Sequence, residues 1–391
     1  MMEEYILKHK NKNVVSFIMD NETYQSGMVK NVYDIERLPF GGQRRETKES
    51  IATFLNYWIN FRGIPQSRED FGDIALMNKI NNGRQLSMGS YGLNLTDHYW
   101  VHKIDKDYKW ENYNFFDNKY NDNFEMKPEY YYLSNKKKIL NPNVSVDGSL
   151  IKCWNRENNN NVLWKKGRGL IKQEPYNELI ANNILQLFEI KHVPYTLDYL
   201  KDGNPISKCD CMVNKDTEYI NADYIFFDKK LDGGNLYESY INACINNGIQ
   251  DAKERIDEMI ILDYIIGNTD RHYGNFGIIR DSNSLKWIKT APIFDNGSCL
   301  FYNNELLDTV QNKIDSKCDW FPGGNQDCLT LINYPFWYDK NKAKNIPQIV
   351  FNGLNENKRL DKIRINEIVN IVEERIKILE NIIDKKINNN I

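Results

Sequence analysis

The feature that most constrains this chain of 391 residues is the order of local signals between residues 259 and 297. An apolar stretch, 259–266, is typical of a buried helix and ends at a glycine. A polar loop, 268–275, follows it. Two short apolar segments within 276–289, joined by Asp, Ser and Asn residues, then predict a β-hairpin. A second acidic position, Asp295, comes after the hairpin and a short apolar strand.

This order is typical of a phosphoryl-transfer site. Such a site needs a carboxylate that orients the acceptor hydroxyl and oxygen ligands that hold Mg²⁺ near the phosphates. Protein kinases supply them as an Asp, an Asn five residues later and a further Asp. Asp270, Asn275 and Asp295 have this spacing. We therefore predict Asp270 as the catalytic residue and Asn275 and Asp295 as metal ligands. We expect Asn268 and His272 to support the loop. For Asp270 and Asn275 taken alone, a simple turn is the alternative.

A lysine and a glutamate upstream complete the pattern. Kinases place a Lys on a strand next to the phosphates and pair it with a Glu on the following helix. Here a predicted strand, 162–165, ends in basic residues, and 173–187 has helical periodicity. Lys165 and Glu178 fit these two roles. Lys166 is the competing lysine, and a surface lysine with a solvated glutamate is the alternative for the pair.

The phosphate-binding turn is predicted in 144–152, which resembles two strands joined by Asp-Gly. Glycine lets backbone N–H groups approach phosphate closely, so Val146, Asp147 and Gly148 are candidate ATP-binding residues. A plain hairpin is the alternative for this segment.

The adenine-binding hinge is predicted from chain order alone. The segment 221–227 is expected to form a strand, and its residues Asp223, Tyr224 and Ile225 are the candidates. An ordinary inner strand is the alternative.

Apolar periodicity predicts the remaining elements. It places Glu258 and Asp263 on the solvent side of a helix, and Thr47 as a helix cap. Strands are expected at 5–7, 14–19, 27–29, 193–200 and 207–213, and helices at 47–62, 234–248, 251–266 and 359–387. The fold class expected is α+β, a two-lobed protein-kinase-like fold with a β-rich N-lobe, an N-terminal extension and a mainly helical C-lobe. Its predicted divisions are 1–40, a small β-unit; 41–135, a helical and loop-rich segment; 136–226, the N-lobe; and 227–391, the C-lobe.

Composition excludes several classes of function. The chain has 51 basic and 54 acidic residues, so no basic excess indicates direct nucleic-acid binding. No apolar run approaches the roughly 20 residues that span a bilayer. The N-terminus lacks the features of a signal peptide. The seven cysteines include no C-x-x-C, which indicates reduced thiols and a cytoplasmic protein. Cys209 and Cys211 fit one face of a strand better than a zinc site.

Several segments resemble the HipA-like serine/threonine protein kinases, with further similarity to their Gram-positive branch. The loop 268–275 looks like the N-x-D-R-H-x-x-N loop of that family, and 291–295 looks like its second metal-binding segment. Residues 164–167 and 173–178 resemble its I-K-G-G and Q-E-P-Y-N-E segments. Three N-terminal segments are also similar: 5–15, 95–100 and 110–116.

The resemblance implies an ATP- and Mg²⁺-dependent kinase that phosphorylates a Ser or Thr of a protein substrate. It also implies a growth-inhibiting toxin regulated by a separate DNA-binding antitoxin, and autophosphorylation at Ser145, with Ser149 as the runner-up. Two departures bear on this: Lys166 stands where the family has Gly, and 315–335 does not match, which leaves substrate binding open. The alternatives are a catalytically inactive binding module on this fold, and a small-molecule or lipid kinase.

Overall fold

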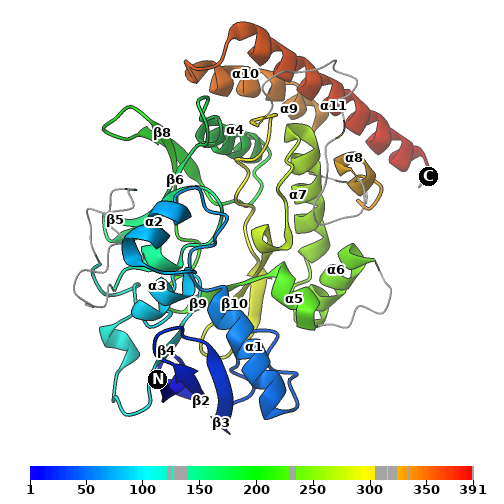
Figure 1. The fold of residues 1–391 in the computed structure, drawn as a ribbon. Helices are drawn as coiled ribbons and strands as arrows, with labels where there is room; N and C mark the ends of the chain where they lie inside the picture. The colour runs from blue at the N-terminus through cyan, green and yellow to red at the C-terminus, as the bar shows by residue number, and fades with distance from the viewer. Residues whose placement is uncertain are drawn as a thin grey trace.

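The computed structural model has a mixed α+β fold built on three sheets (Figure 1). The N-terminal sheet, in blue, lies at one end of the molecule, and the C-terminal helices, in red, lie at the other. The expected linker lysines 136–138 and the aromatic residues Trp320, Phe321 and Phe336 lie outside the described residues. The structure describes residues 1–120, 126, 140–228, 235–303, 315, 324–332, 335 and 337–389.

The N-terminal sheet has the order β3-β2-β1-β4, so its last strand comes from a distant part of the chain. A helix, α1, packs on this sheet through five buried apolar residues, and the Thr47 side chain caps it, as predicted. Two more helices and a 3-10 turn precede and follow β4. The bounds are β1 Met2–His9, β2 Lys12–Asp20, β3 Ser26–Val32, α1 Lys48–Asn60, α2 Phe71–Asn78, α3 Arg84–Gly89, β4 Tyr99–Lys103 and η1 Trp110–Asn112.

The second sheet has the order β5-β6-β8-β7, and all its neighbouring strands are antiparallel. A two-residue turn at Asn158 and Asn159, both with positive φ, joins β5 to β6 and sets their register. The helix α4 follows β6, as predicted. The bounds are η4 Pro142–Ser145, β5 Lys152–Glu157, β6 Asn160–Lys166, α4 Glu174–Leu187, β7 Tyr195–Tyr199 and β8 Pro205–Asp210.

The third sheet, with the order β11-β10-β9, contains the predicted hairpin and lies beside helices of the largest hydrophobic core. That core joins α4, α6, α7, α10 and α11, which explains the long amphipathic C-terminal pattern. The bounds are β9 Thr217–Asn221, α5 Ala222–Asp228, α6 Leu236–Asn246, α7 Ala252–Ile266, η5 Tyr273–Asn275, β10 Gly277–Asp281, β11 Trp287–Thr290, α8 Asn325–Cys328, α9 Lys340–Ala343, α10 Ile346–Glu356 and α11 Lys362–Asn389.

Three sequence-based predictions are wrong. The segment 221–227 is the helix α5, and the strand β9 ends at its first residue. In 144–152, only Val144 and Ser145 belong to a 3-10 turn, and only Lys152 belongs to a strand. Glu258 and Asp263 are buried, with 3% of each exposed. Apolar periodicity failed here because both carboxylates have arginine partners inside the protein, which offset the cost of burying their charge.

Among the described helices, none combines the length and apolar character that crossing a bilayer requires. No disulfide joins any two of the six cysteines in the described part of the chain.

Candidate active site

Lys165 is the centre of the site, because its ammonium group joins three elements. It lies 2.7 Å from Glu178 Oε1 on α4 and 2.7 Å from Asp295 Oδ1 in the loop after β11. It also donates to the hydroxyl of Tyr195 on β7, at 3.2 Å. Burial opposes the charge on Lys165, but the two carboxylates raise its pKa well above the ordinary value. The predicted Lys165–Glu178 pair is therefore present.

Strand alternation decides between the two adjacent lysines. Successive side chains on a strand point to opposite faces of the sheet. Lys166 therefore points away from the site, and its ammonium group donates to the carbonyl of Met126.

The predicted catalytic loop, residues 268–275, starts where α7 ends. Gly267 ends this helix in the left-handed conformation, with φ at 61°, which glycine adopts at little cost. The side chain of Asn268 then accepts a hydrogen bond from the Asp270 amide, and Asn275 Nδ2 donates to the Asp270 carbonyl. His272 is exposed and caps the turn η5 by accepting from the Gly274 amide. Asn268 and His272 thus hold the loop closed around Asp270.

Arg271, which sequence reasoning did not select, ties the catalytic loop to the loop of Asp295. It is 1% exposed and forms a two-bond contact with Asp263 of α7, at 2.9 and 3.0 Å. It also donates to the carbonyls of Asn275 and Phe294, at 3.0 and 2.7 Å. A further bond reaches Asn296 Oδ1 at 2.6 Å. One guanidinium group therefore sets the spacing of the two loops.

Asp270 and Asp295 lie close enough to influence each other's ionisation. Burial and the charge of Asp295 raise the pKa of Asp270. The increase is opposed by the electrostatic effect of His272, by a hydrogen bond from Ser298, and by the charge of Arg168. Burial also disfavours the ionised form of Asp295, but Lys165 and Lys152 lower its pKa below the ordinary value. Asp295 thus stays charged, whereas Asp270 is suited to accept a proton.

The oxygen atoms at this position fit a magnesium ion. The amide nitrogen of Asn275 is used within the loop, and no described residue donates to its Oδ1. In the described part of the chain, Asp295 Oδ2 likewise receives no hydrogen bond. An amide oxygen and a carboxylate oxygen are ligands that Mg²⁺ prefers. That Asn275 and Asp295 hold one ion together stays a prediction.

A second lysine was also missed. Lys152 begins β5 directly opposite Lys165 on β6, so the two side chains share one face of the sheet. Lys152 is 6% exposed and makes no hydrogen bond to a described residue, and burial lowers its pKa. A side chain at Gly148, where φ is 99°, would collide with its ammonium group. The turn predicted to bind phosphate therefore lies directly over a buried cation.

The residues of this turn differ in exposure. Val146 is buried, whereas Asp147 is exposed and accepts from the Gly148 amide at 2.7 Å. Ser145 is buried, with its hydroxyl donating to the carbonyls of Leu93 and Pro142. Ser149 is partly exposed.

The three hinge candidates lie in the first turns of α5. Ile225 is buried in the main core, and Tyr224 packs between that core and the core of the N-terminal sheet. Asp223 lies near enough to His272 of the loop 268–275 for that residue to affect its ionisation. Burial raises its pKa, and His272 opposes the increase. Contact of these residues with nucleotide stays a prediction.

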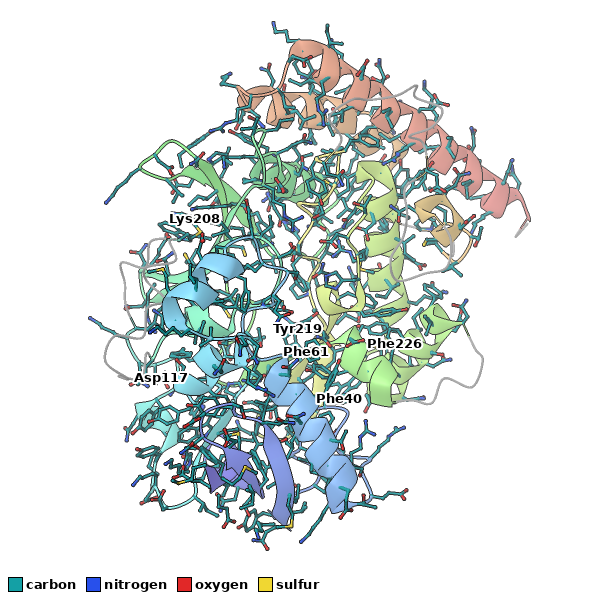
Figure 2. The ribbon with its side chains drawn as sticks, in the orientation of Figure 1. Phe40, Phe61, Asp117, Lys208, Tyr219 and Phe226 are labelled. Carbon is teal, nitrogen blue, oxygen red and sulfur yellow. The ribbon has the colours of Figure 1, made fainter. Side chains whose placement is uncertain are left out.

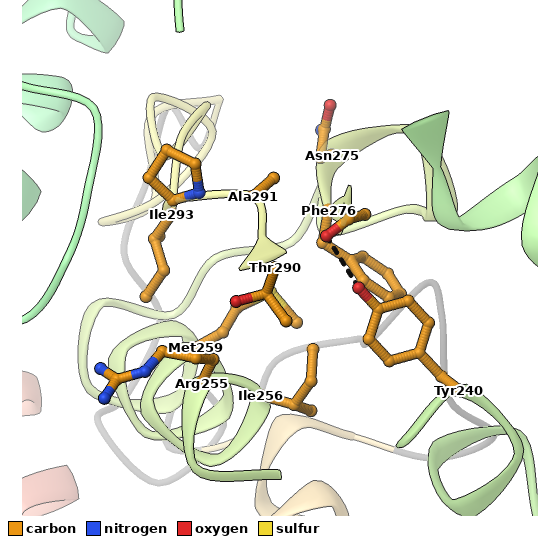
Figure 3. A pocket seen from close by; sticks show the side chains of 11 residues that line it. Tyr240, Arg255, Ile256, Met259, Asn275, Phe276, Thr290, Ala291 and Ile293 are labelled. Atoms are coloured by element: carbon orange, nitrogen blue, oxygen red, sulfur yellow. Dashed lines mark hydrogen bonds between the residues drawn. The ribbon is translucent and has the colours of Figure 1, made fainter. Parts of the chain in front are cut away.

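Strand β9 itself is fastened to the catalytic loop. The hydroxyl of Tyr219, labelled near the centre of Figure 2, donates to the carbonyls of Gly274 and Phe276, each at 2.9 Å. Behind that loop lies a small cavity of about 10 Å³, with Asn275 and Tyr240 among its lining residues (Figure 3). Its volume suits a single water and excludes a nucleotide.

Comparison with known proteins supports the fold. No family model matches the chain. The serine/threonine-protein kinase CtkA of Helicobacter pylori is 45% identical over 62 residues, which is 16% of this chain and 18% of that kinase. The match thus spans less than a fifth of the kinase's length. The crystal structure of the H. pylori proinflammatory kinase CtkA aligns with 61% of this chain and 95% of its own, at a TM-score of 0.48 and 20% identity.

HipA of Shewanella oneidensis, solved in its toxin–antitoxin system with HipB and operator DNA, aligns over 97% of this chain and 99% of its own. The TM-score is 0.51 and the identity 10%. The chain therefore has a mixed α+β fold similar to that of HipA, as the sequence motifs predicted.

Proposed function

We propose that this protein is an ATP-dependent serine/threonine protein kinase of the HipA-like type with two lobes. The observation that carries the proposal is the contact of buried Lys165 with both Glu178 and Asp295. Kinases need this lysine–glutamate pair and the metal-binding aspartate in place together. The short, strong match to CtkA and the HipA-like fold support the same class.

The residues of this chain have separate roles in the transfer. Lys165 and Lys152 bind phosphate oxygens of ATP, and Glu178 orients Lys165. Asn275 and Asp295 would hold Mg²⁺, which would offset the negative charge of the phosphates. The acceptor hydroxyl oxygen forms a bond to the γ-phosphorus, and its proton passes to Asp270. The bond from the γ-phosphorus to the bridging oxygen breaks, and ADP leaves with that electron pair.

Transfer of label from γ-labelled ATP tests this function directly. Wild type should label itself or a general protein acceptor, whereas Asp270→Asn and Asp295→Asn should each lose about 10²–10³ in rate. Asp198→Asn is the matched control, because it removes the charge of a surface aspartate that pairs with Lys208. Equal labelling by all four proteins would exclude the kinase function and favour a binding module.

Autophosphorylation is the proposed regulation, with Ser145 as the first candidate and Ser149 as the second. Because Ser145 is buried and bonded to Leu93, its turn must leave this position before the hydroxyl can react. Mass spectrometry after incubation with ATP should find phosphate within 143–152 in wild type and none in Asp270→Asn. Absence of phosphate there in active wild type would exclude this regulation.

We also propose a separate antitoxin-like partner and a toxin role, because the Shewanella HipA was solved with HipB. Expression of wild type should slow growth, and Asp270→Asn should not. Growth equal to that of the variant, at matched protein levels, would remove the toxin role and leave the kinase function standing.

A further inference from the structure

Arg168 lies in the loop between β6 and α4, and the transfer chemistry above gives it no role. Its backbone amide donates to both carboxylate oxygens of Glu174, at 3.2 and 3.1 Å. Glu174 is 2% exposed and begins α4, beside Gly297 of the Asp295 loop. A buried side chain therefore anchors the backbone of Arg168 at the edge of the site.

The side chain of Arg168 contacts the turn over Lys152. Its guanidinium Nη2 donates to the hydroxyl of Ser149, next to Gly148 in the turn over Lys152. On the other side it is near enough to the Asp270 carboxyl to oppose the effect of burial on the pKa of that group. Arg168 thus bonds the turn predicted to bind phosphate and lies within electrostatic range of Asp270.

The charges around the site leave Arg168 uncommitted. Lys165 is already paired with Glu178 and Asp295. Within the part of the chain that the structure describes, no carboxylate forms an ion pair with the Arg168 guanidinium group. In the same part of the chain, the Ser149 hydroxyl is the one hydrogen-bond partner of that group. A guanidinium group matches the oxygens of a phosphoryl group in a two-bond contact. A neutral hydroxyl is a weaker partner that such an anion can displace.

We propose that Arg168 binds the γ-phosphoryl group of ATP, exchanging the Ser149 hydroxyl for non-bridging γ-oxygens. The inference rests on the proposed kinase function and identifies a residue that binds the γ-phosphate. While the acceptor oxygen bonds to the γ-phosphorus and the bridging oxygen departs with ADP, Arg168 stabilises the charge on the transferring group. The acceptor proton still passes to Asp270. Arginines that do this in other phosphotransferases raise the rate by several orders of magnitude.

Arg168→Gln tests the assignment because it removes the charge and keeps a polar side chain. Mg²⁺-ATP affinity should fall about tenfold or more, since a hydrogen bond to a charged group is worth about 1.5–3 kcal/mol, while Mg²⁺-ADP affinity changes little. The transfer rate should fall about 10²–10³-fold. The ATP affinity and transfer rate of Arg168→Lys should lie between those of wild type and Arg168→Gln, because lysine keeps the charge and loses the two-bond geometry of the guanidinium group. Added guanidinium ion should restore part of the Arg168→Gln rate, an effect that a loop-anchoring role alone would not produce.

Leu170→Ala is the control, because Leu170 lies in the same loop with 91% of its surface exposed. Its affinities and rate should match wild type. Equal loss of ATP and ADP affinity in Arg168→Gln, or wild-type rates in that variant, would overturn the assignment. If Arg168→Gln does not fold, Arg168→Lys decides, and a wild-type rate in that variant refutes it. Failure of wild type to bind either nucleotide would instead refute the kinase function itself.

Discussion

Replacing Arg271 by lysine should separate the spacing of the two catalytic loops from the charge that stabilises the interior. Arg271 makes five hydrogen bonds, two to Asp263 and one each to the carbonyls of Asn275 and Phe294 and to the side chain of Asn296. A lysine keeps a positive charge for Asp263. It cannot reach three other groups in different directions from one nitrogen atom.

The magnitude follows from the bonds that are lost. Losing two or three buried hydrogen bonds should lower the free energy of unfolding by about 2–4 kcal/mol, at about 1–1.5 kcal/mol each. Catalysis should fall more, because a displacement of about 1 Å between reacting groups costs roughly 10²-fold in rate. Arg271→Ala should be less stable still, by about 3–5 kcal/mol relative to wild type, because it leaves the buried Asp263 carboxylate without its positively charged partner.

Two assays measure these effects on one preparation. Denaturant unfolding gives the change in stability, and transfer from γ-labelled ATP at a temperature where both proteins are folded gives the rate. Arg255→Lys is the matched control, because Arg255 also pairs with a carboxylate of α7, Glu258, and its described ion pairs all go to residues of α7 and its N-cap. A folded Arg271→Lys protein with wild-type kcat would refute the argument that Arg271 sets the loop spacing.

Three further predictions concern charge. Lys152→Ala should raise KM for ATP about 10–100-fold, the value of a hydrogen bond to a charged group, whereas Lys166→Ala, which removes a lysine directed away from the site, should leave KM unchanged in the same assay. Burial and Asp295 raise the pKa of Asp270, so the acidic limb of the kcat/KM profile should have its midpoint above the pKa of an ordinary aspartate. A midpoint at about 3.9 contradicts this. Burial lowers the pKa of His9, which forms a hydrogen bond with Glu218, so the unfolded chain binds a proton more readily than the folded protein does. The stability that His9 contributes is present above its unfolded pKa of about 6.5 and is lost as the pH falls toward its folded pKa. A melting temperature that drops as much between pH 8 and 5 in His9→Gln as in wild type would exclude His9 as the source of this pH dependence.

Much of the site could be predicted from the sequence because it depends on short-range order. Asp270 and Asn275 belong to one loop, and a hairpin of predictable turn chemistry separates them from Asp295. The lysine–glutamate pair was predictable because Lys165 ends a strand and Glu178 lies in the first turns of the next helix. In each case chain connectivity limits the distance between the groups.

What the sequence by itself determined was the set of local elements and the spacing of the reactive residues along the chain. Tertiary structure alone decided that Asp263 is buried, since its partner Arg271 and the carbonyls that Arg271 binds come from separate loops. It also decided that Lys152 lies opposite Lys165, because this register depends on the backbone conformation of the turn at Asn158 and Asn159, where both φ angles are positive. The helix α5, where a strand was expected, packs Ile225 into the main core and Tyr224 against two cores, and these contacts involve residues distant in sequence. Contacts between residues distant in sequence are set by packing and charge pairing, and local periodicity carries no record of them.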